Sequence, residues 1–462
     1  MDFLILRFTF HVAMRLNNTL SFSRRVAVVA VLLSLSFAGL QAQLTPEQAS
    51  QQVQLNTITT AVPFLMIGPD SRSGALGDAG VALSPDANSL HWNPAKMAFS
   101  ENEVEFSLSY APWLRALVDD MNLAYLSGVK RINKRQAWGA ALRYFSLGNI
   151  TFTDESGTTI RDFQPAEFSL DVGYSQKLSD KFSGGIAGRF INSNLTGGTN
   201  VLGANSKPGR SVAVDISAFY SNPRTKFAGR DAAFNWGVNI SNIGAKMSYS
   251  ESADRDFIPT NLKLGSALTM KLDDYNSLTF TADANKLLVP TSPIYAQEDR
   301  DIIVSGYDPN VGVATGMLQS FFDAPGRAYF VGPVTSDVNG DGVVNDIDLD
   351  RNGDQIINAA DEYIVEEGSI LREEIREWNI GGGIEYLYND VFAFRTGFFN
   401  EHRSKGARQF ITLGAGIKYT VFTVDLSYLI STRQQNPLAN TLRFTLRLQF
   451  SDLVNSSGDS ED

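Results

Sequence analysis

Hydrophobic and polar residues alternate with a period of two in many short segments of this chain. The segment 442–450, LRFTLRLQF, has leucine and phenylalanine at every even position and polar residues at every odd one. Successive side chains of a β-strand point to opposite faces, so this pattern predicts a strand with one apolar and one polar face. The same alternation recurs at 168–175, 212–217, 234–241 and 422–428.

The pattern predicts fourteen strands, most of them about ten residues long, which is the length that a tilted strand needs to cross a membrane. They begin near residues 104, 121, 136, 166, 182, 210, 232, 260, 276, 376, 391, 409, 421 and 440. Long and short connections tend to alternate, as in outer-membrane barrels, although the turn at 221–231 is longer than this rule expects. The favoured fold class is all-β, a transmembrane antiparallel β-barrel over 101–450. A soluble β-sandwich or propeller is the alternative, and the even strand count and aromatic outer faces disfavour it.

The first part of the chain has the anatomy of a secretory leader. Arg24 and Arg25 precede an apolar run, and Leu40, Gln41 and Ala42 offer a cleavage site before Gln43. This pattern predicts a signal peptide over 1–42. A membrane-anchor helix is the alternative, but the run is short and no stop-transfer pattern follows it.

Charge and composition narrow the possible functions. The net charge is −11, and residues 1–42 carry a net +3, so the remaining chain carries −14. A balance this acidic argues against nucleic acid as a partner. Cysteine is absent, which excludes disulfides and thiolate chemistry. The three histidines, His11, His91 and His402, form no readable catalytic or zinc-binding arrangement, so we expect no enzyme.

The presumed inward-facing positions carry both signs of charge, which predicts a wet interior in which these residues pair with one another. They are Glu105, Arg143, Asp171, Arg189, Asp215, Lys263, Asp283, Glu385, Arg395, Lys418 and Asp425.

The segment before the first strand does not alternate. Within it, Gly74, Gly77 and Gly80 are spaced three apart, and turn-forming residues follow. This spacing is no dinucleotide fingerprint, because no βαβ unit surrounds it. A segment rich in glycine and turns, placed just before a barrel, predicts an N-terminal hatch over 43–100 that folds into the lumen.

The hatch sequence resembles that of a known family. Asn93-Pro94-Ala95, within GDAGVALSPDANSLHWNPAK, is similar to the shared motif of the FadL-like outer-membrane barrels. Together with the preceding TAVPFLMIGPDSRSGALGDAG, it resembles more narrowly the PorV family, the outer-membrane barrel of the type IX secretion system of Bacteroidota.

The resemblance implies a place and a function. It implies the outer membrane of a Bacteroidota-type Gram-negative bacterium and a shuttle that takes secreted proteins with a C-terminal signal domain from the translocon to the surface attachment machinery. The implied partners are the type IX translocon and attachment complex, this cargo, and outer-membrane lipid. A transporter for hydrophobic small molecules, as the broader FadL-like group implies, is the alternative. A structural or adhesive surface protein is a third hypothesis.

The longest connection, 288–375, contains an acidic duplication. Two twelve-residue segments, 337–348 and 350–361, repeat their oxygen-bearing residues with a period of thirteen. Oxygen ligands at positions 1, 3, 5, 9 and 12, with a backbone carbonyl at position 7, are typical of a calcium loop. The predicted structural calcium ligands are Asp337, Asn339, Asp341, Val343, Asn345, Asp348, Asp350, Asn352, Asp354, Ile356, Asn358 and Asp361.

The two loops differ at position 6, where a calcium loop turns sharply. Gly342 fits this turn in the first loop, whereas Gln355 occupies it in the second. The pattern resembles dockerin or thrombospondin type 3 repeats more than a helical sensor EF-hand. A solvated acidic loop is the alternative. Strand counting predicts that the insertion lies on the outer side of the membrane, and an acidic tail over 451–462 ends the chain.

Overall fold

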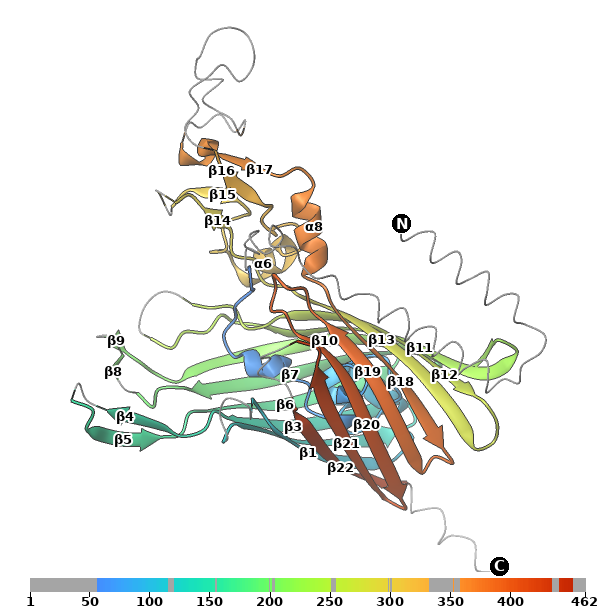
Figure 1. Cartoon of the computed structure of the whole chain (residues 1–462). Helices are drawn as coiled ribbons and strands as arrows, with labels where there is room; N and C mark the ends of the chain where they lie inside the picture. Colours follow the sequence, from blue (N-terminus) through green and yellow to red (C-terminus); the bar gives the residue numbers. More distant parts are fainter. Residues whose placement is uncertain are drawn as a thin grey trace, which may run out of the picture. The chain divides into compact units, whose positions relative to one another are not determined.

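The computed structural model describes residues 56–451, except 115–119, 154–155, 199, 202–203, 251–254, 298, 300, 332–351, 353–357 and 434–439. The described chain forms a closed barrel of fourteen antiparallel strands (Figure 1). The barrel strands are β1 (Val104–Pro112), β2 (Asn122–Asn133), β3 (Gln136–Ser146), β6 (Ala166–Lys177), β7 (Phe182–Asn194), β10 (Gly209–Phe227), β11 (Arg230–Gly244), β12 (Asn261–Lys271), β13 (Asn276–Leu287), β18 (Asn379–Tyr388), β19 (Phe392–Asn400), β20 (Gln409–Tyr419), β21 (Phe422–Ser431) and β22 (Leu442–Phe450).

The strand prediction is confirmed in number and order. Every predicted start lies within three residues of an observed one. Neighbours in sequence pair throughout, and β1 closes the barrel against β22, with Val104 opposite Phe450. Full closure leaves no strand edge unpaired, which a membrane-spanning sheet requires because lipid offers no hydrogen bonds.

The two faces of the strands separate as the alternation predicts. On β6, Leu170 and Val172 are 49% and 54% exposed on the outer wall, whereas Ser169 and Asp171 are buried toward the lumen. Such an apolar outer belt around a polar interior is the pattern of an outer-membrane barrel. Among the described helices, none is long and apolar enough to cross a membrane.

The two ends of the barrel differ in the length of their connections. One end carries tight hairpins, and we call it the short-turn end. The opposite end carries the long connections, and we call it the long-loop end. In bacterial outer-membrane barrels, the long loops face the cell exterior. The expectation of a long turn at 221–231 is wrong, because β10 and β11 continue past the belt. Only Ala228 and Gly229 connect them, with φ angles of 51° and 77°. Positive φ at both central residues is what a tight type I′ hairpin turn requires.

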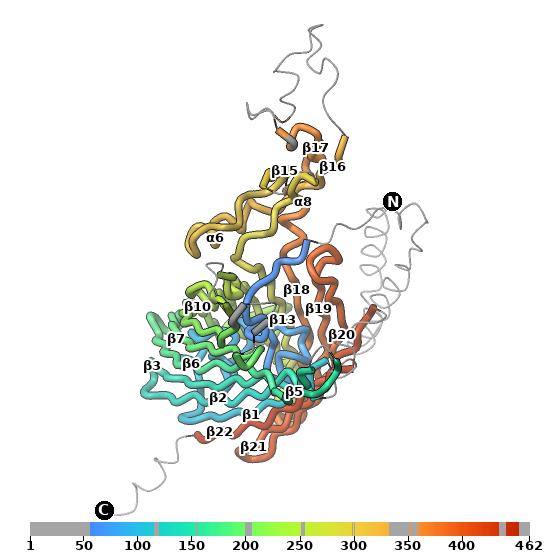
Figure 2. Tube along the Cα trace, turned by 90° about the vertical axis from the view of Figure 1, so that its left-hand side faces the viewer, coloured from blue at the N-terminus to red at the C-terminus, as the bar shows by residue number. Residues whose placement is uncertain are grey.

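The hatch crosses the whole lumen from the long-loop end to the short-turn end. Asn56 donates its N–H to Ser404 O at 2.9 Å, and Ala61 donates to Phe257 O at 2.8 Å, both in long connections. The chain then runs inside the barrel, surrounded by the strands, as the blue trace in Figure 2 shows, and reaches β1. Its helical turns are η1 (Pro63–Met66), α4 (Ser71–Gly74), α5 (Ser89–Trp92) and η2 (Pro94–Phe99).

The long connections carry small elements of their own. Two-stranded sheets are formed by β4 (Ile150–Thr153) with β5 (Thr159–Phe163) and by β8 (Asn200–Val201) with β9 (Ala204–Asn205). The insertion contains the pairs β14 (Ile294–Tyr295) with β15 (Ile303–Ser305) and β16 (Ala328–Phe330) with β17 (Tyr363–Val365). Its helices are α6 (Val313–Gln319), η3 (Ala359–Glu362) and α8 (Ser369–Arg376). The predicted signal peptide, and the acidic tail beyond residue 451, lie outside the described residues.

Candidate functional site

The N-P-A motif fixes the last turn of the hatch to the barrel wall. The Asn93 side chain accepts the N–H of Ala95 at 3.0 Å and so caps η2, while Pro94, which has no N–H, starts that turn. The amide group of Asn93 also donates to the carbonyl of Ala218 on β10 at 3.0 Å. Ser183 on β7 donates to the carbonyl of Ala95 at 2.7 Å. The motif therefore begins a turn and binds two strands at once.

Glycine lets the hatch backbone touch the wall on the opposite side of the lumen. Gly77 has a φ of +71°, and a β-carbon there would lie 2.3 Å from the carbonyl oxygen of Phe398. On the wall, a β-carbon at Gly397 would lie 2.2 Å from the Gly77 nitrogen. Because atoms cannot approach this closely, both positions need glycine, one on the hatch and one on β19.

Six buried charged residues of alternating sign form a closed ring that joins the hatch to the wall. In order, the members of this ionic ring are Arg72, Glu385, Arg395, Asp425, Arg447 and Asp86. Arg72 of the hatch contacts Glu385 at 3.0 and 3.1 Å and Asp86 at 3.2 Å. Arg395 contacts Glu385 and Asp425 at 2.6 Å each. Arg447 reaches Asp425 at 2.7 Å and Asp86 at 3.6 Å.

The ring confirms in part what the alternation predicts. The alternation places Glu385, Arg395 and Asp425 inward, where they are expected to pair. Arg447 is a further member of the ring, and its alternating position in β22 is the signal that places it in the lumen. The two hatch members, Arg72 and Asp86, lie in a segment without alternation, so nothing in the sequence indicates which strands they meet.

Further polar contacts hold the middle of the hatch. The Asp283 carboxylate on β13 accepts the N–H groups of Gly80 and Val81 at 2.6 and 2.9 Å. Arg443 on β22 forms an ion pair with Asp78. Since buried polar groups need partners, these contacts fix the hatch in one position across the lumen.

On the side of the lumen formed by β2, β3 and β7, the hatch packs through apolar side chains. Leu90 and Met97 of the hatch are fully buried there. The complete cluster consists of Leu90, Met97, Tyr125, Val129, Ala137, Ala141 and Ala187. The contact here is mainly apolar, with added hydrogen bonds from the buried Arg143 of β3 to the carbonyls of Phe64 and Leu65 at 3.2 and 2.7 Å.

A cavity of about 600 Å³ opens above the hatch at the long-loop end. Its walls are mainly apolar and come from both the hatch and the barrel: Pro63, Phe64, Met66, Ile67, Trp113, Leu114, Met121, Phe145, Phe410 and Leu429. Three arginines, Arg408, Arg433 and Arg443, also line it. We call this space the mouth cavity.

The arginines of the mouth cavity are not equally neutralised. Arg408 forks onto Glu401 at 2.8 Å, and Arg443 is paired with Asp78. Among the described residues, no carboxylate forms an ion pair with Arg433. Burial, with the neighbouring Arg403 adding to it and Glu401 opposing it, lowers the pKa of Arg433. The mouth cavity therefore offers an apolar floor with a cationic rim.

A second, more polar cavity of about 250 Å³ adjoins the mouth cavity. The two share Met66, Gly68, Asp78, Gly406 and Arg408 as lining residues. The mouth of the barrel thus has an apolar half and a polar half, divided by the start of the hatch and by the connection between β19 and β20.

Three of the twelve predicted calcium ligands lie within the described residues. Asp361 is buried, and its two carboxylate oxygens accept the N–H groups of Asn352 at 3.2 Å and Asn358 at 2.9 Å. Asn358 in turn caps η3 by accepting the N–H of Ala360 at 2.7 Å. Positions 3, 9 and 12 of the second loop are thus brought together. The other nine lie outside the described residues: Asp337, Asn339, Asp341, Val343, Asn345, Asp348, Asp350, Asp354 and Ile356.

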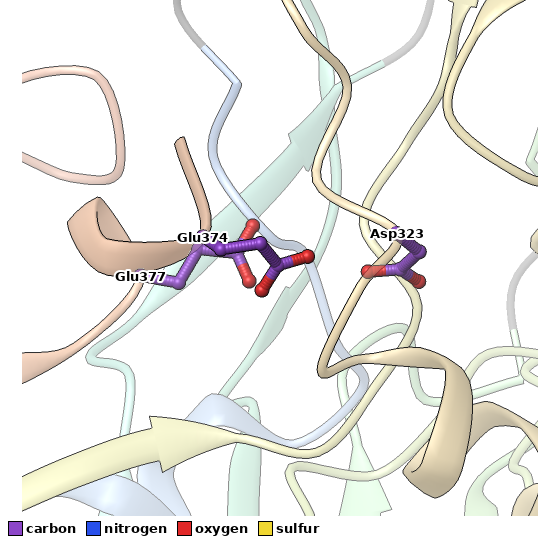
Figure 3. A group of neighbouring side chains, drawn as sticks. All are labelled: Asp323, Glu374 and Glu377. Atoms are coloured by element: carbon purple, nitrogen blue, oxygen red, sulfur yellow. The ribbon is translucent and has the colours of Figure 1, made fainter. Parts of the chain in front are cut away.

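A different group of acids, which no sequence pattern indicates, gathers at the base of the insertion. The carboxylates of Asp323, Glu374 and Glu377 lie within 4.8 Å of one another, and Figure 3 shows those of Asp323 and Glu374 pointing toward each other. Lys286 contacts Glu374 at 3.1 Å and Glu377 at 2.6 Å, and Lys405 contacts Glu377 at 2.9 Å. Two ammonium groups already pair with two of the three carboxylates, so the cluster has the character of a buried ion-pair network rather than of a metal site.

Comparison with known proteins gives a family. The sequence profile of the family described as type IX secretion system protein PorV matches residues 48–294, more than half of the chain. The match covers the hatch and the strands from β1 to β13. Among curated proteins, none matches the chain in sequence.

Solved structures with similar chain paths include three membrane proteins of other bacteria. The Ralstonia pickettii toluene transporter TbuX is 11% identical, with a TM-score of 0.40 over 82% of this chain and 98% of its own. The P. putida toluene transporter TodX is 10% identical, with a TM-score of 0.41 over 82% and 98%. A Pseudomonas aeruginosa FadL homologue is 12% identical, with a TM-score of 0.38 over 86% and 100%.

Proposed function

Because the chain belongs to the PorV family of type IX secretion system proteins, we propose that it is an outer-membrane shuttle for secreted proteins. It receives cargo that bears a C-terminal signal domain from the translocon and presents it to the surface attachment machinery. The family match over the hatch and the first nine barrel strands is the observation that carries this proposal.

The closed lumen supports a role in holding cargo rather than conducting it. The ionic ring and the glycine contacts fix the hatch across the barrel. In the described part of the chain, the hatch therefore blocks the lumen to a polypeptide. Cargo then docks at the long-loop end. The mouth cavity falls in the range of about 300–1,000 Å³ that small-ligand sites occupy. It can take one or a few side chains, while a folded domain rests on the rim.

The test is a deletion strain complemented with matched variants. We expect deletion to leave signal-bearing proteins unattached or held in the periplasm. Arg433→Glu reverses the charge at the mouth and should reproduce part of this loss, whereas Lys226→Glu makes the same change on the exposed β10–β11 hairpin at the other end. Normal surface attachment in the deletion strain would overturn the proposal.

The apolar lining of the mouth cavity is also compatible with a second function, the uptake of hydrophobic small molecules. A greasy substrate would have to pass the buried charges of the ionic ring, which disfavours this function. Impaired uptake of a long-chain fatty acid in the deletion strain, with cargo attachment intact, would support transport instead.

We also propose that residues 337–361 bind two calcium ions on the outer side of the membrane. The repeated oxygen ligands support this, and the affinity should be that of an extracellular module, about 10⁻⁴–10⁻³ M. The first loop should bind more tightly, because Gly342 suits the turn where the second loop has Gln355. Isothermal titration of the whole barrel tests it: Asp337→Ala and Asp350→Ala should each remove one binding event. Absence of calcium heat at millimolar concentration would leave a solvated acidic loop.

A further inference from the structure

Helix α8 (Ser369–Arg376) buries its polar side chains and exposes its apolar ones. The side chains it buries are polar, namely Ser369, Glu373 and Glu374. The side chains it exposes include Ile370, Leu371 and Ile375, which are 46%, 67% and 63% exposed. A surface helix of a soluble domain normally turns its apolar stripe toward the core. This helix turns it outward.

Ion pairs to the barrel hold the helix in this rotation. Lys286 on β13 is 1% exposed and contacts both Glu374 and Glu377. Lys405 contacts Glu377 as well, and the N–H of Ala324 donates to Glu374 at 2.7 Å. A buried ammonium group must keep its carboxylate partners, so the acidic side of α8 faces the barrel.

The position of Lys286 places α8 over the outer surface of the rim. Lys286 lies at the same alternating positions of β13 as Phe280 and Ala282, which are exposed on the lipid-facing wall. Alternate residues of a strand share a face, so the Lys286 side chain leaves the barrel on its outer side. The helix that covers it therefore stands above the wall and not over the lumen alone.

The exposed apolar stripe of α8 continues into the lipid-facing wall. Leu371 and Ile375 are spaced four residues apart, as on one helix face, and Trp378 follows two residues beyond the end of the helix. The chain then enters β18, whose outward residues Ile380 and Ile384 are 57% and 39% exposed. One apolar surface thus runs from the membrane belt across the rim and onto the helix.

We propose that α8 lies in the outer interface of the membrane, with its Leu371 and Ile375 side chains, and Trp378 just after the helix, in contact with lipid. Tryptophan is enriched at this level because its ring is apolar and its N–H is polar. Interfacial helices bury their apolar face about 5–10 Å into the boundary of headgroups and acyl chains. The insertion is then anchored to the membrane surface beside the β13–β18 seam. This goes beyond the shuttle function and does not depend on it.

Site-directed spin labelling of the full barrel in phosphatidylcholine vesicles tests the proposal. The chain has no cysteine, so Leu371→Cys and Ile375→Cys each provide a single attachment point. Ile384→Cys on the wall is the lipid reference, and Ile364→Cys on β17, which is 51% exposed, is the matched control on the insertion. We expect labels at 371 and 375 to collide with oxygen more than with an aqueous nickel chelate, as at 384, and the label at 364 to do the reverse. Their depth should be about 5–10 Å.

Two results would overturn the proposal. Labels at 371 and 375 that meet the nickel chelate as freely as the label at 364 would place α8 in water. Labels shielded from both reagents would indicate that protein, such as a second copy of the chain, covers the face. Heat-modifiable gel mobility confirms that each variant is folded. A further variant, Glu377→Gln, should loosen the helix and raise the nickel accessibility at 375 without changing that at 384.

Discussion

The two sides of the lumen hold the same hatch by different physical means. On the side of β18 to β22, the contact is an ionic ring of three arginines and three acids. On the side of β2, β3 and β7, it is an apolar cluster around Leu90 and Met97, supported by hydrogen bonds from Arg143 of β3 to hatch carbonyls. Nearby, Asn93 of the hatch donates one hydrogen bond to β10.

The difference shows that the position of the hatch and its stability can have separate physical origins. Charge pairs have fixed partners and fixed geometry, and their desolvation cost offsets much of their attraction. Apolar packing has no direction, yet it stabilises in proportion to the area it removes from water. We therefore expect the charged side to specify where the hatch sits and the apolar side to supply much of the stability that keeps it there.

The largest effect is expected from breaking the ionic ring. Glu385→Gln leaves both Arg72 and Arg395 short of a charge partner in a buried site. Removing one member of a buried ion pair costs about 3–5 kcal/mol of unfolding free energy. Urea unfolding in lipid vesicles measures it, with Lys418→Gln at an exposed lumen position as the control. A change no larger than the control would show that the ring is dispensable.

A comparable but somewhat smaller loss is expected on the apolar side. Leu90→Ala removes a fully buried side chain and should cost about 2–5 kcal/mol. Leu90→Met keeps the volume and should cost less than about 1.5 kcal/mol. The same unfolding assay at low and high salt sharpens the comparison, because the Leu90 variants should respond to salt no more than the unmodified barrel. A strong salt dependence specific to Leu90→Ala would contradict the division between the two sides.

Asn93 offers a smaller and more local test. Asn93→Ala removes the cap of η2 and should cost about 0.5–2 kcal/mol. Asn93→Asp keeps the capping oxygen but loses the amide that donates to Ala218, so it separates the cap from the wall contact. If both variants unfold alike, the bond to β10 is the important one.

The smallest expected effect is a pH response of α8. Burial raises the pKa of Asp323 to about 7, with Glu377 and Glu374 adding to the rise and Lys286 opposing it. An acid whose folded-state pKa is raised contributes stability that is fully present below its ordinary pKa of 3.8 and is lost as the pH rises from there to about 7. A spin label at Ile375→Cys should become more mobile as the pH rises through about 7, because Asp323 then gains a negative charge beside Glu374 and Glu377. Adding Asp323→Asn should make the mobility of the label independent of pH in this range. If the double variant keeps the same pH dependence, Asp323 is not the group responsible.

Much of the barrel could be predicted from the sequence, because lipid outside and water inside impose a period of two on every strand. The exception at 221–231 is instructive. Pro223, Arg224 and Lys226 lie in a part of the β10–β11 hairpin beyond the belt, where neither face meets lipid. The alternation ends there although the strands continue.

The hatch and the insertion were less accessible to sequence reasoning. Arg72 and Glu385 are 313 residues apart, and no local pattern connects them. On α8, the spacing of Leu371 and Ile375 indicates a helical face but not which way it points. That direction depends on Lys286, in a strand far away in the sequence.

The threaded hatch has a consequence for the order of assembly. Residues 56–103 precede β1, yet they span the lumen from one end to the other and meet both the first and the last strands. The barrel closes only when β22, made last, pairs with β1. A segment with helical turns and buried charged side chains cannot readily be drawn through a finished cylinder. The hatch must therefore be enclosed as the wall forms around it, and the pairing of β1 with β22 is the last step of barrel closure.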